Sequence, residues 1–468
     1  MKITFINPHI DQEAAYGRRF KHLGSVLPPL GLCYLAGVLE KAGYRVNIID
    51  ANLLNLPHKE ILKKIGEATP DIIGLYATTL GIEIAEDMAK SIKESFPRIY
   101  VVIGGPHMSG YGKDTLKCRY FDFGIIGEGE YSFLGLVRHL EKGSCEFEGL
   151  RGLAYRSNGE IIQNEPVLPI QNLDEIPFPA RHLLPRMKNY HPKIMLFKKQ
   201  PVAHIFTSRG CPYRCIFCQT PFGKNVRFHS AEYVADEITM LVNDFEIREI
   251  KINDDTFNLS ENRIFKIFDI LKKRGINIPW SCNLRVDTVK DKRFLRAIKD
   301  MGCWLIRPGL ESGNQEVLDG LKKGITIEQS KQVCNWAKEA GLKIQASFII
   351  GSPLDTEETI LETINFAKTL PVHYPTFSLM TPFPGTELWN AANRYGIFSY
   401  NRFSDLALSH RFTFIPKGLD KEKMAYLCKR AYRDTYLNPA MIVRQLKGID
   451  NFVEFKRLCS AGFNFLFR

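Results

Sequence analysis

Short apolar runs alternate with amphipathic segments through most of the chain. In the first third, apolar runs at 2–7, 44–50, 71–78, 98–103 and 122–126 have the length of buried strands, and the segments at 32–42, 59–67, 82–95 and 131–141 have helical spacing. Strands separated by single helices pair in parallel and are covered on both faces. The pattern therefore predicts an α/β domain with an open, doubly wound parallel sheet of Rossmann-like type.

The same alternation resumes near residue 204 and continues to residue 380. It predicts strands at 204–208, 249–253, 280–284, 304–310, 344–350 and 376–380, with helices near 231–245, 261–274, 291–300, 327–340 and 356–370. Six such units predict a partial (β/α)6 barrel of the TIM type rather than a closed barrel of eight.

The remaining segments divide the chain into domains. The stretch between the two α/β regions is irregular and rich in Pro, with one predicted hairpin around 153–163, and helices are predicted at 421–436 and 441–447. We therefore expect a first domain at 1–143, a connector at 144–200, the barrel at 201–390 and a helical C-terminal region at 391–468.

The carboxyl ends of the first set of strands are rich in small and polar residues. They carry Asn7, Thr78 and Thr79, Gly104 to His107, and Gly127 to Glu130. Ligands of doubly wound sheets bind at this edge, and glycines there let the backbone approach a bulky ligand closely. No Gly-x-Gly-x-x-Gly sequence follows the first strand, which argues against NAD or FAD.

Three cysteines lie within eight residues, at Cys211, Cys215 and Cys218. Three thiolates on one tight loop suit an iron–sulfur cluster that keeps one iron without a protein ligand. A structural zinc site closes with four protein ligands, and the loop offers no fourth Cys or His. A disulfide is disfavoured by the odd number of thiols in the loop. The metal ligands predicted here are these three cysteines.

Composition and charge indicate the cellular environment and the possible partners of the protein. The chain has 468 residues, 45% of them hydrophobic, and its eleven cysteines are otherwise scattered, which fits a reducing cytoplasm better than a disulfide framework. No apolar run reaches the length of about 18 residues expected of a membrane span, and no signal peptide is predicted. The net charge of +12 is concentrated near the C-terminus. Such a basic end can attract an anionic substrate, nucleic acid or a membrane surface, or can be a solvated helical face.

The Cys-x3-Cys-x2-Cys loop resembles that of the radical S-adenosylmethionine (SAM) enzymes. The resemblance implies a [4Fe-4S] cluster whose open iron is chelated by SAM, and reductive cleavage of SAM to a 5′-deoxyadenosyl radical. It also implies SAM contacts from residues at the barrel mouth: the adenine by Phe217 and Gly351, the methionyl amine by Asp254 and Asp255, the carboxylate by Arg285, and ribose and carboxylate by Glu311 and Ser312. Phe217 could instead simply pack under the loop, and each acid could be a helix cap or half of a surface pair.

The first domain resembles the cobalamin-binding domain that precedes many radical SAM domains. The resemblance rests on the Pro28-Pro29-Leu30-Gly31 helix start and on the small and polar strand ends. It implies cobalamin contacts from Asn7, Thr78, Thr79, Gly104, Gly105, His107, Glu128 and Gly129. The Asp-x-His-x-x-Gly sequence that supplies a cobalt ligand in methionine-synthase-like domains is absent, so no lower cobalt ligand is assigned.

Together the two resemblances imply a cobalamin-dependent radical SAM enzyme that methylates an unactivated carbon of a small or lipid-like substrate. An external flavodoxin- or ferredoxin-type donor is expected, nucleic acid is not, and the basic segment 452–467 either contacts a membrane surface or caps the barrel. The alternatives are a non-methylating cyclase, rearrangement or carbon–carbon coupling enzyme, and a tRNA-modifying radical SAM enzyme.

The residues that could face the substrate are left unranked; they are Asn283, Trp280, Trp304 and Arg307. We expect Cys282 and Cys303 to be buried, and no catalytic residue is assigned.

Overall fold

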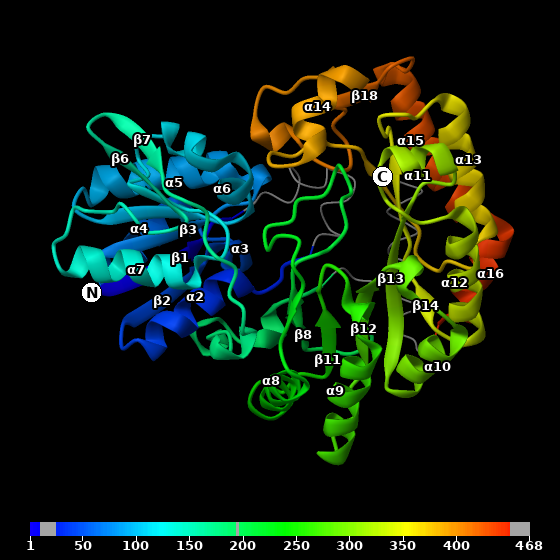
Figure 1. Cartoon of the computed structure of the whole chain (residues 1–468), viewed down its shortest axis with the longest axis horizontal. Coiled ribbons are helices and arrows are strands. Elements are labelled where there is room, and N and C mark those ends of the chain that lie inside the picture. Colours follow the sequence, from blue (N-terminus) through cyan, green and yellow to red (C-terminus); the bar gives the residue numbers. More distant parts are fainter. Residues whose placement is uncertain (10–24, 193–195, 450–468) are drawn as a thin grey trace.

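The computed structural model describes residues 1–9, 25–192 and 196–449. Two α/β regions lie side by side, the first sheet in one half and the barrel in the other (Figure 1). The segment that carries the three cysteines lies between them, where it is drawn as a green loop above β8 (Val202–Ile205) (Figure 1). The predicted fold class, a doubly wound parallel sheet followed by a partial barrel, is confirmed.

The first sheet has seven strands in the order β2-β1-β3-β4-β5-β6-β7. The first five are mutually parallel, as predicted, and each is followed by a helical segment. The hairpin that the sequence assigned to the connector pairs antiparallel with β5 and extends this sheet. The strands are β1 (Lys2–Asn7), β2 (Arg45–Asp50), β3 (Ile72–Tyr76), β4 (Tyr100–Gly104), β5 (Phe123–Ile125), β6 (Leu153–Ser157) and β7 (Glu160–Gln163).

Helices cover both faces of this sheet. On one face, α2 (Leu30–Lys41) and α7 (Gly129–Glu141) share a core with the strands, and on the other face α4 (His58–Ala68) and α5 (Ile82–Ser95) form a second core. The almost continuous burial of β1 follows from this double cover. The short helices α3 (Ala51–Leu54) and α6 (Pro106–Tyr111) follow β2 and β4 at the carboxyl edge.

The barrel sheet runs in the order β8-β11-β12-β13-β15-β16, with all pairs parallel and the short β14 beside β13. Since β8 and β16 do not pair with each other, the barrel is open, as the six predicted units require. The other strands are β11 (Glu249–Ile252), β12 (Trp280–Leu284), β13 (Cys303–Glu311), β14 (Lys343–Ile344), β15 (Ser347–Ile350) and β16 (Thr376–Leu379).

The outer wall of the barrel is helical. It comprises α8 (Ala231–Asp244), α9 (Glu261–Lys273), α10 (Lys292–Asp300), α11 (Gln315–Gly320), α12 (Ile327–Glu339) and α13 (Glu357–Thr369). Capping side chains fix several starts: Ser230 accepts from the Tyr233 amide, and Thr326 and Gln329 form a capping box. One continuous apolar core joins these helices to the outward faces of the strands.

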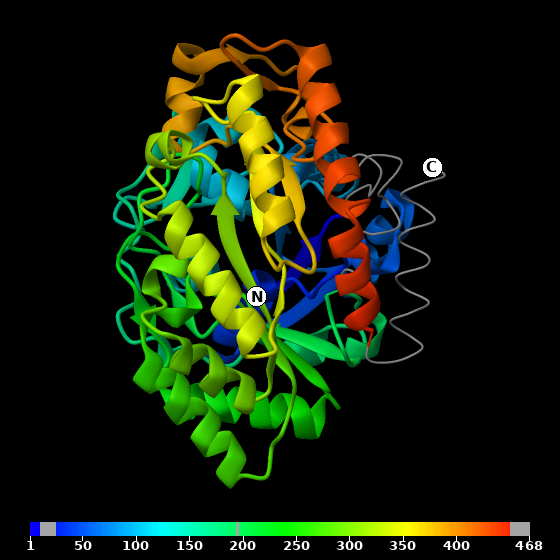
Figure 2. The same ribbon diagram turned by 90° about the vertical axis from the view of Figure 1, so that its right-hand side faces the viewer.

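The C-terminal region packs on the barrel. Its elements are α14 (Glu387–Tyr395), the hairpin β17 (Gly396–Phe398) and β18 (Phe414–Pro416), α15 (Lys421–Tyr436) and α16 (Pro439–Lys447). Figure 2 shows α15 alongside α13. The basic segment 452–467 lies outside the described residues. Among the helices that the structure does describe, none combines the length and the apolar character that crossing a bilayer would need.

Candidate functional site

The three-cysteine loop is seated on a small ladder that sequence reasoning missed. Immediately after β8, β9 (Ser208–Arg209) pairs antiparallel with β10 (Arg227–Phe228), so the loop leaves and returns at one place. The Cys211 amide donates to the Gly223 carbonyl at 3.1 Å, which closes the loop on itself. Two-residue strands with no apolar alternation leave little signal in a sequence.

The backbone conformation directly before the first cysteine requires a glycine, which is Gly210. Its φ is +90°, and a Cβ there would lie 2.3 Å from the carbonyl oxygen of Asn225. No other residue can make this turn without moving the backbone of the returning strand. The position of Cys211 therefore depends on a glycine.

The three thiols share one environment. The Cys218 side chain reaches solvent, but partial desolvation by the surrounding loop raises its pKa to about 11, with further upward contributions from the charges of Cys215, Asp255 and Cys211. No three His, Cys, Asp or Glu side chains in the described parts of the chain converge on a single metal ion. Cysteines that hold an iron–sulfur cube each bind a different iron, so they need not converge on one point. The loop fits a cluster held at three irons better than a single ion.

Arg285 brings positive charge to this loop. Its guanidinium stacks 3.4 Å from the ring centroid of Tyr213, and Nη1 lies 3.9 Å from the Sγ of Cys215. The same side chain forms two hydrogen bonds to Asp287, at 2.9 and 3.2 Å. A cation beside a thiol favours the thiolate that iron binds.

The two aspartates after β11 have different surroundings. Asp254 is fully buried and accepts hydrogen bonds from the Thr207 amide (2.6 Å), the Thr207 hydroxyl (2.5 Å) and the Ser208 hydroxyl (2.7 Å). Asp255 reaches solvent on the thiol side, where partial burial and the charge of Asp254 raise its pKa to about 6. Asp254 thus anchors the start of the cysteine segment, while Asp255 remains available to a ligand.

The other residues predicted to contact SAM lie at the same mouth. Phe217 packs partly against the apolar cluster of Ile216 and its neighbours. Glu311 forms a buried ion pair with Lys323 at 2.6 Å, and the Ser312 hydroxyl lies 3.0 Å from that of Thr363. Gly351 has φ +82°, and its amide donates to Asp355 at 2.9 Å.

The carboxyl edge of the first sheet carries the predicted cobalamin contacts. Asn7 donates to Asp50 at 2.9 Å, and Gly105 has φ +104°. Among the described residues, a Cβ at Gly104 would meet one atom within 4 Å, a carbonyl oxygen 4.0 Å away, so no described side chain crowds the backbone there. Such a cradle fits a large flat ligand. Thr78 and Thr79 follow β3 at the same edge.

His107 lies at this edge but is almost fully buried. Its Nδ1 is 3.4 Å from the Thr79 hydroxyl, and its ring lies 4.6 Å from that of Phe403 and 5.3 Å from that of Tyr111. Burial lowers the pKa of His107 to about 4, so the imidazole is neutral. Aromatic rings from both halves of the chain therefore enclose it.

A buried ion-pair network joins the carboxyl edge of the first sheet to the cysteine loop and was not predicted. Arg209, next to Gly210, donates to Glu128 at 3.2 Å and to Glu130 at 2.6 Å, and Glu128 also pairs with Arg227. All four side chains are nearly inaccessible to solvent. Glu128, a predicted cobalamin contact, and Gly129 beside it thus lie in a segment bound to the cysteine loop. Their pairing depends on the tertiary fold, which no local pattern reports.

The two halves also touch through glycines. A Cβ on Gly110, in α6, would lie 2.4 Å from the Pro384 carbonyl and 2.9 Å from the Gln219 side chain. Gln219 follows Cys218 and donates to the Pro384 carbonyl at 2.6 Å. Gly385 opposes Gly110 at a similarly close distance. The carboxyl edge of the first sheet, the cysteine loop and the end of the barrel therefore meet at one point.

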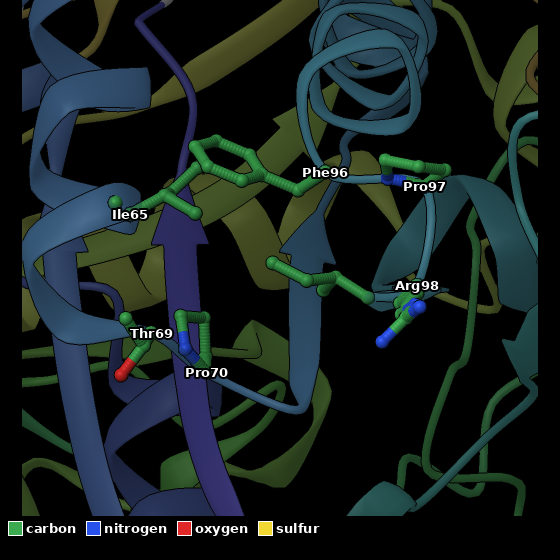
Figure 3. Close-up of a pocket in the computed structure, with 8 residues that line it drawn as sticks. Ile65, Thr69, Pro70, Phe96, Pro97 and Arg98 are labelled. Carbon is green, nitrogen blue, oxygen red and sulfur yellow. The ribbon is translucent and has the colours of Figure 1, made fainter.

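One surface hollow lies away from this junction. It is lined by residues that include Ile65, Phe96 and Arg98, and the Phe96 ring lies beside Ile65 (Figure 3). Its walls precede β3 and β4, so it opens at the amino ends of the strands. Ligands of such sheets bind at the opposite edge, and we assign the hollow no function.

Comparisons with known proteins agree with this geometry. A family model of the radical SAM superfamily matches residues 205–367, and one of the B12 binding domain matches 20–137. An uncharacterized methyltransferase of Pyrococcus horikoshii is 37% identical over 453 residues, covering 95% of both chains. The anaerobic magnesium-protoporphyrin IX monomethyl ester cyclase of Rubrivivax gelatinosus is 28% identical over 450 residues, 94% of this chain and 78% of the cyclase.

A solved structure shares the fold. The cobalamin-dependent SAM radical enzyme OxsB, with aquacobalamin and SAM bound, superposes with a TM-score of 0.76 at 17% identity. The match covers 99% of this chain and 71% of OxsB.

Proposed function

The chain belongs to the radical SAM enzymes that carry an N-terminal B12-binding domain, and from this premise we propose that it methylates an unactivated carbon of a small or lipid-like substrate. Its cofactors are a [4Fe-4S] cluster, SAM and cobalamin. Cys211, Cys215 and Cys218 would hold the cluster. When bound, the cluster with SAM supplies radical hydrogen abstraction, and cobalamin supplies a methyl group.

The observation that carries this proposal is the buried link between the two cofactor edges. Arg209 lies two residues before Cys211 and pairs with Glu128 and Glu130, which follow β5 at the cobalamin edge. Because these side chains are buried, the two edges are held facing the same space. Two cofactors held this way can act on one substrate in turn without releasing it.

The chemistry of methylation gives a reason to combine the cluster and SAM with cobalamin in one protein. A carbon without a lone pair cannot attack the SAM methyl group as a nucleophile, so it must first lose a hydrogen atom. The residues of this chain then have to position the substrate and exclude water. We propose that Asp255 and Arg285, which lie beside the thiols, orient SAM, with Phe217, Glu311, Ser312 and Gly351 completing its site; the role of Asp254 is to anchor the loop.

For cobalamin we propose contacts from the edge formed by Asn7, Thr78, Thr79, Gly104, Gly105 and Gly129. His107 and Glu128 support this edge from behind through their buried partners. The relation to a methyltransferase at 37% identity supports the methyl transfer. We further propose an external one-electron donor of flavodoxin or ferredoxin type, and peripheral membrane contact through the segment 452–467.

The runner-up is a non-methylating radical reaction such as ring closure. It is supported by the 28% identity to the Rubrivivax gelatinosus cyclase over 94% of this chain. The two functions differ in their products. Methylation adds a CH2 unit to the substrate and yields S-adenosylhomocysteine together with 5′-deoxyadenosine, whereas ring closure yields no S-adenosylhomocysteine.

The test is anaerobic reconstitution with iron, sulfide and hydroxocobalamin, followed by dithionite and SAM. We expect absorption bands of both cofactors and formation of 5′-deoxyadenosine, which Cys215→Ala should abolish. Cys145→Ala, at an exposed cysteine, is the matched control and should leave the absorption bands and the formation of 5′-deoxyadenosine unchanged. A reconstituted chain that binds no cobalamin would contradict methylation while leaving the radical chemistry intact.

A further inference from the structure

Of the four residues that the sequence left unranked, Asn283 and Arg307 lie on the inner face of the barrel towards the carboxyl ends of the strands. Trp280 is fully buried on the helical side, stacked on Phe268 at 4.4 Å, and Trp304 donates to Glu249 at the start of β11. Asn283 and Arg307 are register partners on β12 and β13. This leaves one cationic side chain among the candidates.

Burial alternates along these strands and identifies their inner row. Ile306, Ile344 and Cys282 are part of the core under the outer helices. The residue after each of them therefore points to the other side of the sheet, because successive side chains alternate. Since Ile306 and Ile344 are register partners, Arg307 and Gln345 are neighbours. The inner row is polar and consists of Asn253, Asn283, Arg307 and Gln345.

Among the residues that the structure describes, Arg307 has no carboxylate partner. Its Nη2 donates to the Ile252 carbonyl at 2.9 Å and lies 3.4 Å from the Asn253 amide oxygen, and its buried Nε has no hydrogen-bond partner. No ion pair among the described residues includes it. Burial lowers the pKa of Arg307 to about 10, so the side chain still carries its charge at neutral pH.

The neighbouring charges do not neutralise it. Glu249 already accepts from the amides of Lys198 and Lys199 and from the Trp304 indole. His204 is buried, its Nδ1 has no hydrogen-bond partner in the described part of the chain, and burial together with nearby cations, Arg307 among them, lowers its pKa to about 3. A buried cation without a counter-charge is costly, so an anion from outside the chain should bind there.

We propose that Arg307 binds an anionic group of the substrate, a carboxylate or a phosphate- or phosphonate-type oxyanion, inside the barrel. Asn283 and Gln345, in the same row, offer amides that can complete the contact. This inference deepens the proposed function and rests on it only in placing the reacting molecule in the barrel. It would restrict the substrates to molecules that carry a negative charge near the reacting carbon.

The test uses inorganic phosphate and acetate as probes, titrated by calorimetry into the reconstituted and desalted protein. We expect saturable binding to the unaltered chain and at least roughly tenfold weaker binding to Arg307→Gln. Arg98→Gln, at an exposed arginine of the first domain, is the matched control and should bind as the unaltered chain does. The affinity for SAM should be the same in all three, because Arg307 is not among the residues proposed to hold SAM.

A second variant keeps the proposal testable if Arg307→Gln folds poorly. Gln345→Glu places a carboxylate beside Arg307, so it should raise the thermal midpoint and abolish binding of both probes. Equal probe binding by all variants, or no saturable binding by the unaltered chain, would overturn the proposal. A loss of SAM affinity in Arg307→Gln would also overturn it, because the anion would then be the carboxylate of SAM. None of these outcomes depends on whether the enzyme methylates.

Discussion

Gly210 shows how much the cysteine loop depends on single backbone positions. Gly210→Ala should destabilise the fold by about 3 kcal/mol and prevent full iron loading, because the new Cβ meets the Asn225 carbonyl. Gly223→Ala is the control: it also has a positive φ, +74°, but no atom of the described residues would lie within 4 Å of the new Cβ, so it should cost only about 1 kcal/mol. For each variant, the iron content measures the loading of the loop and the denaturant midpoint measures the stability. Equal effects would mean that strain in φ alone matters.

At the same scale, His107 should make stability depend on pH. The folded chain protonates this imidazole only near pH 4, whereas the unfolded chain does so near its ordinary value of 6.5. Because the unfolded state binds the proton first, stability is lost as the pH falls from 6.5 towards 4, by about 2–3 kcal/mol from this group.

His107→Gln should therefore reduce the difference in unfolding free energy between pH 7 and pH 4.5 by that amount. Between pH 7 and pH 8 the unfolding free energies of the unaltered chain and of His107→Gln should differ by a constant amount. Denaturant unfolding of the cofactor-free chain provides the measurement. An unchanged acid dependence would show that the imidazole is hydrated in solution, contrary to its burial behind Phe403.

Among the elements, the link between β9 and the segment after β5 should dominate stability. Glu130→Gln leaves the buried Arg209 with less negative charge and should cost about 3 kcal/mol. Glu165→Gln removes half of an exposed pair with Arg151 at the same 2.6 Å distance and should cost at most about 1 kcal/mol. Denaturant unfolding compares the two variants. Similar costs would indicate that water reaches the buried pair.

Elements were predictable where periodicity was strong. β1, α5, β12 and α15 have the bounds that the sequence predicts, because each shows a clean apolar pattern with a defined start and stop. The β9–β10 ladder and α3 were missed because such short elements are fixed by their surroundings. The β6–β7 hairpin was predicted, but its pairing with β5 was not, since pairing between distant segments has no local signal.

The candidate site also has one part that the sequence predicts and one part that it does not. The three cysteines, and the glycines at the strand ends, follow from local spacing and from the rule that parallel sheets bind ligands at their carboxyl ends. The internal partners of Asp254, Glu128 and Glu311 could not be predicted, because Thr207, Arg209 and Lys323 come from other elements.

Across the whole molecule, the contact of Gly110 with Pro384 should set the spacing of the two halves. Gly110→Ala would push the cobalamin edge from the barrel mouth, since its Cβ would lie 2.4 Å from a carbonyl oxygen. We expect methylated product to fall by roughly a hundredfold while 5′-deoxyadenosine still forms, because small misplacements of reacting groups are costly. Gly31→Ala, whose new Cβ would meet no atom within 4 Å in the described part of the chain, should change neither product. A parallel loss of both would mean that the contact instead supports the cluster.

The four side chains Arg209, Arg227, Glu128 and Glu130 also limit how such proteins can be recombined. A chimera that joins this first domain to the barrel of a relative would bury two carboxylates opposite whatever that barrel carries at the two arginine positions. It would fold only if the foreign barrel supplied equivalent cations. The halves of this chain are therefore not interchangeable modules, and they are expected to have diversified as a pair.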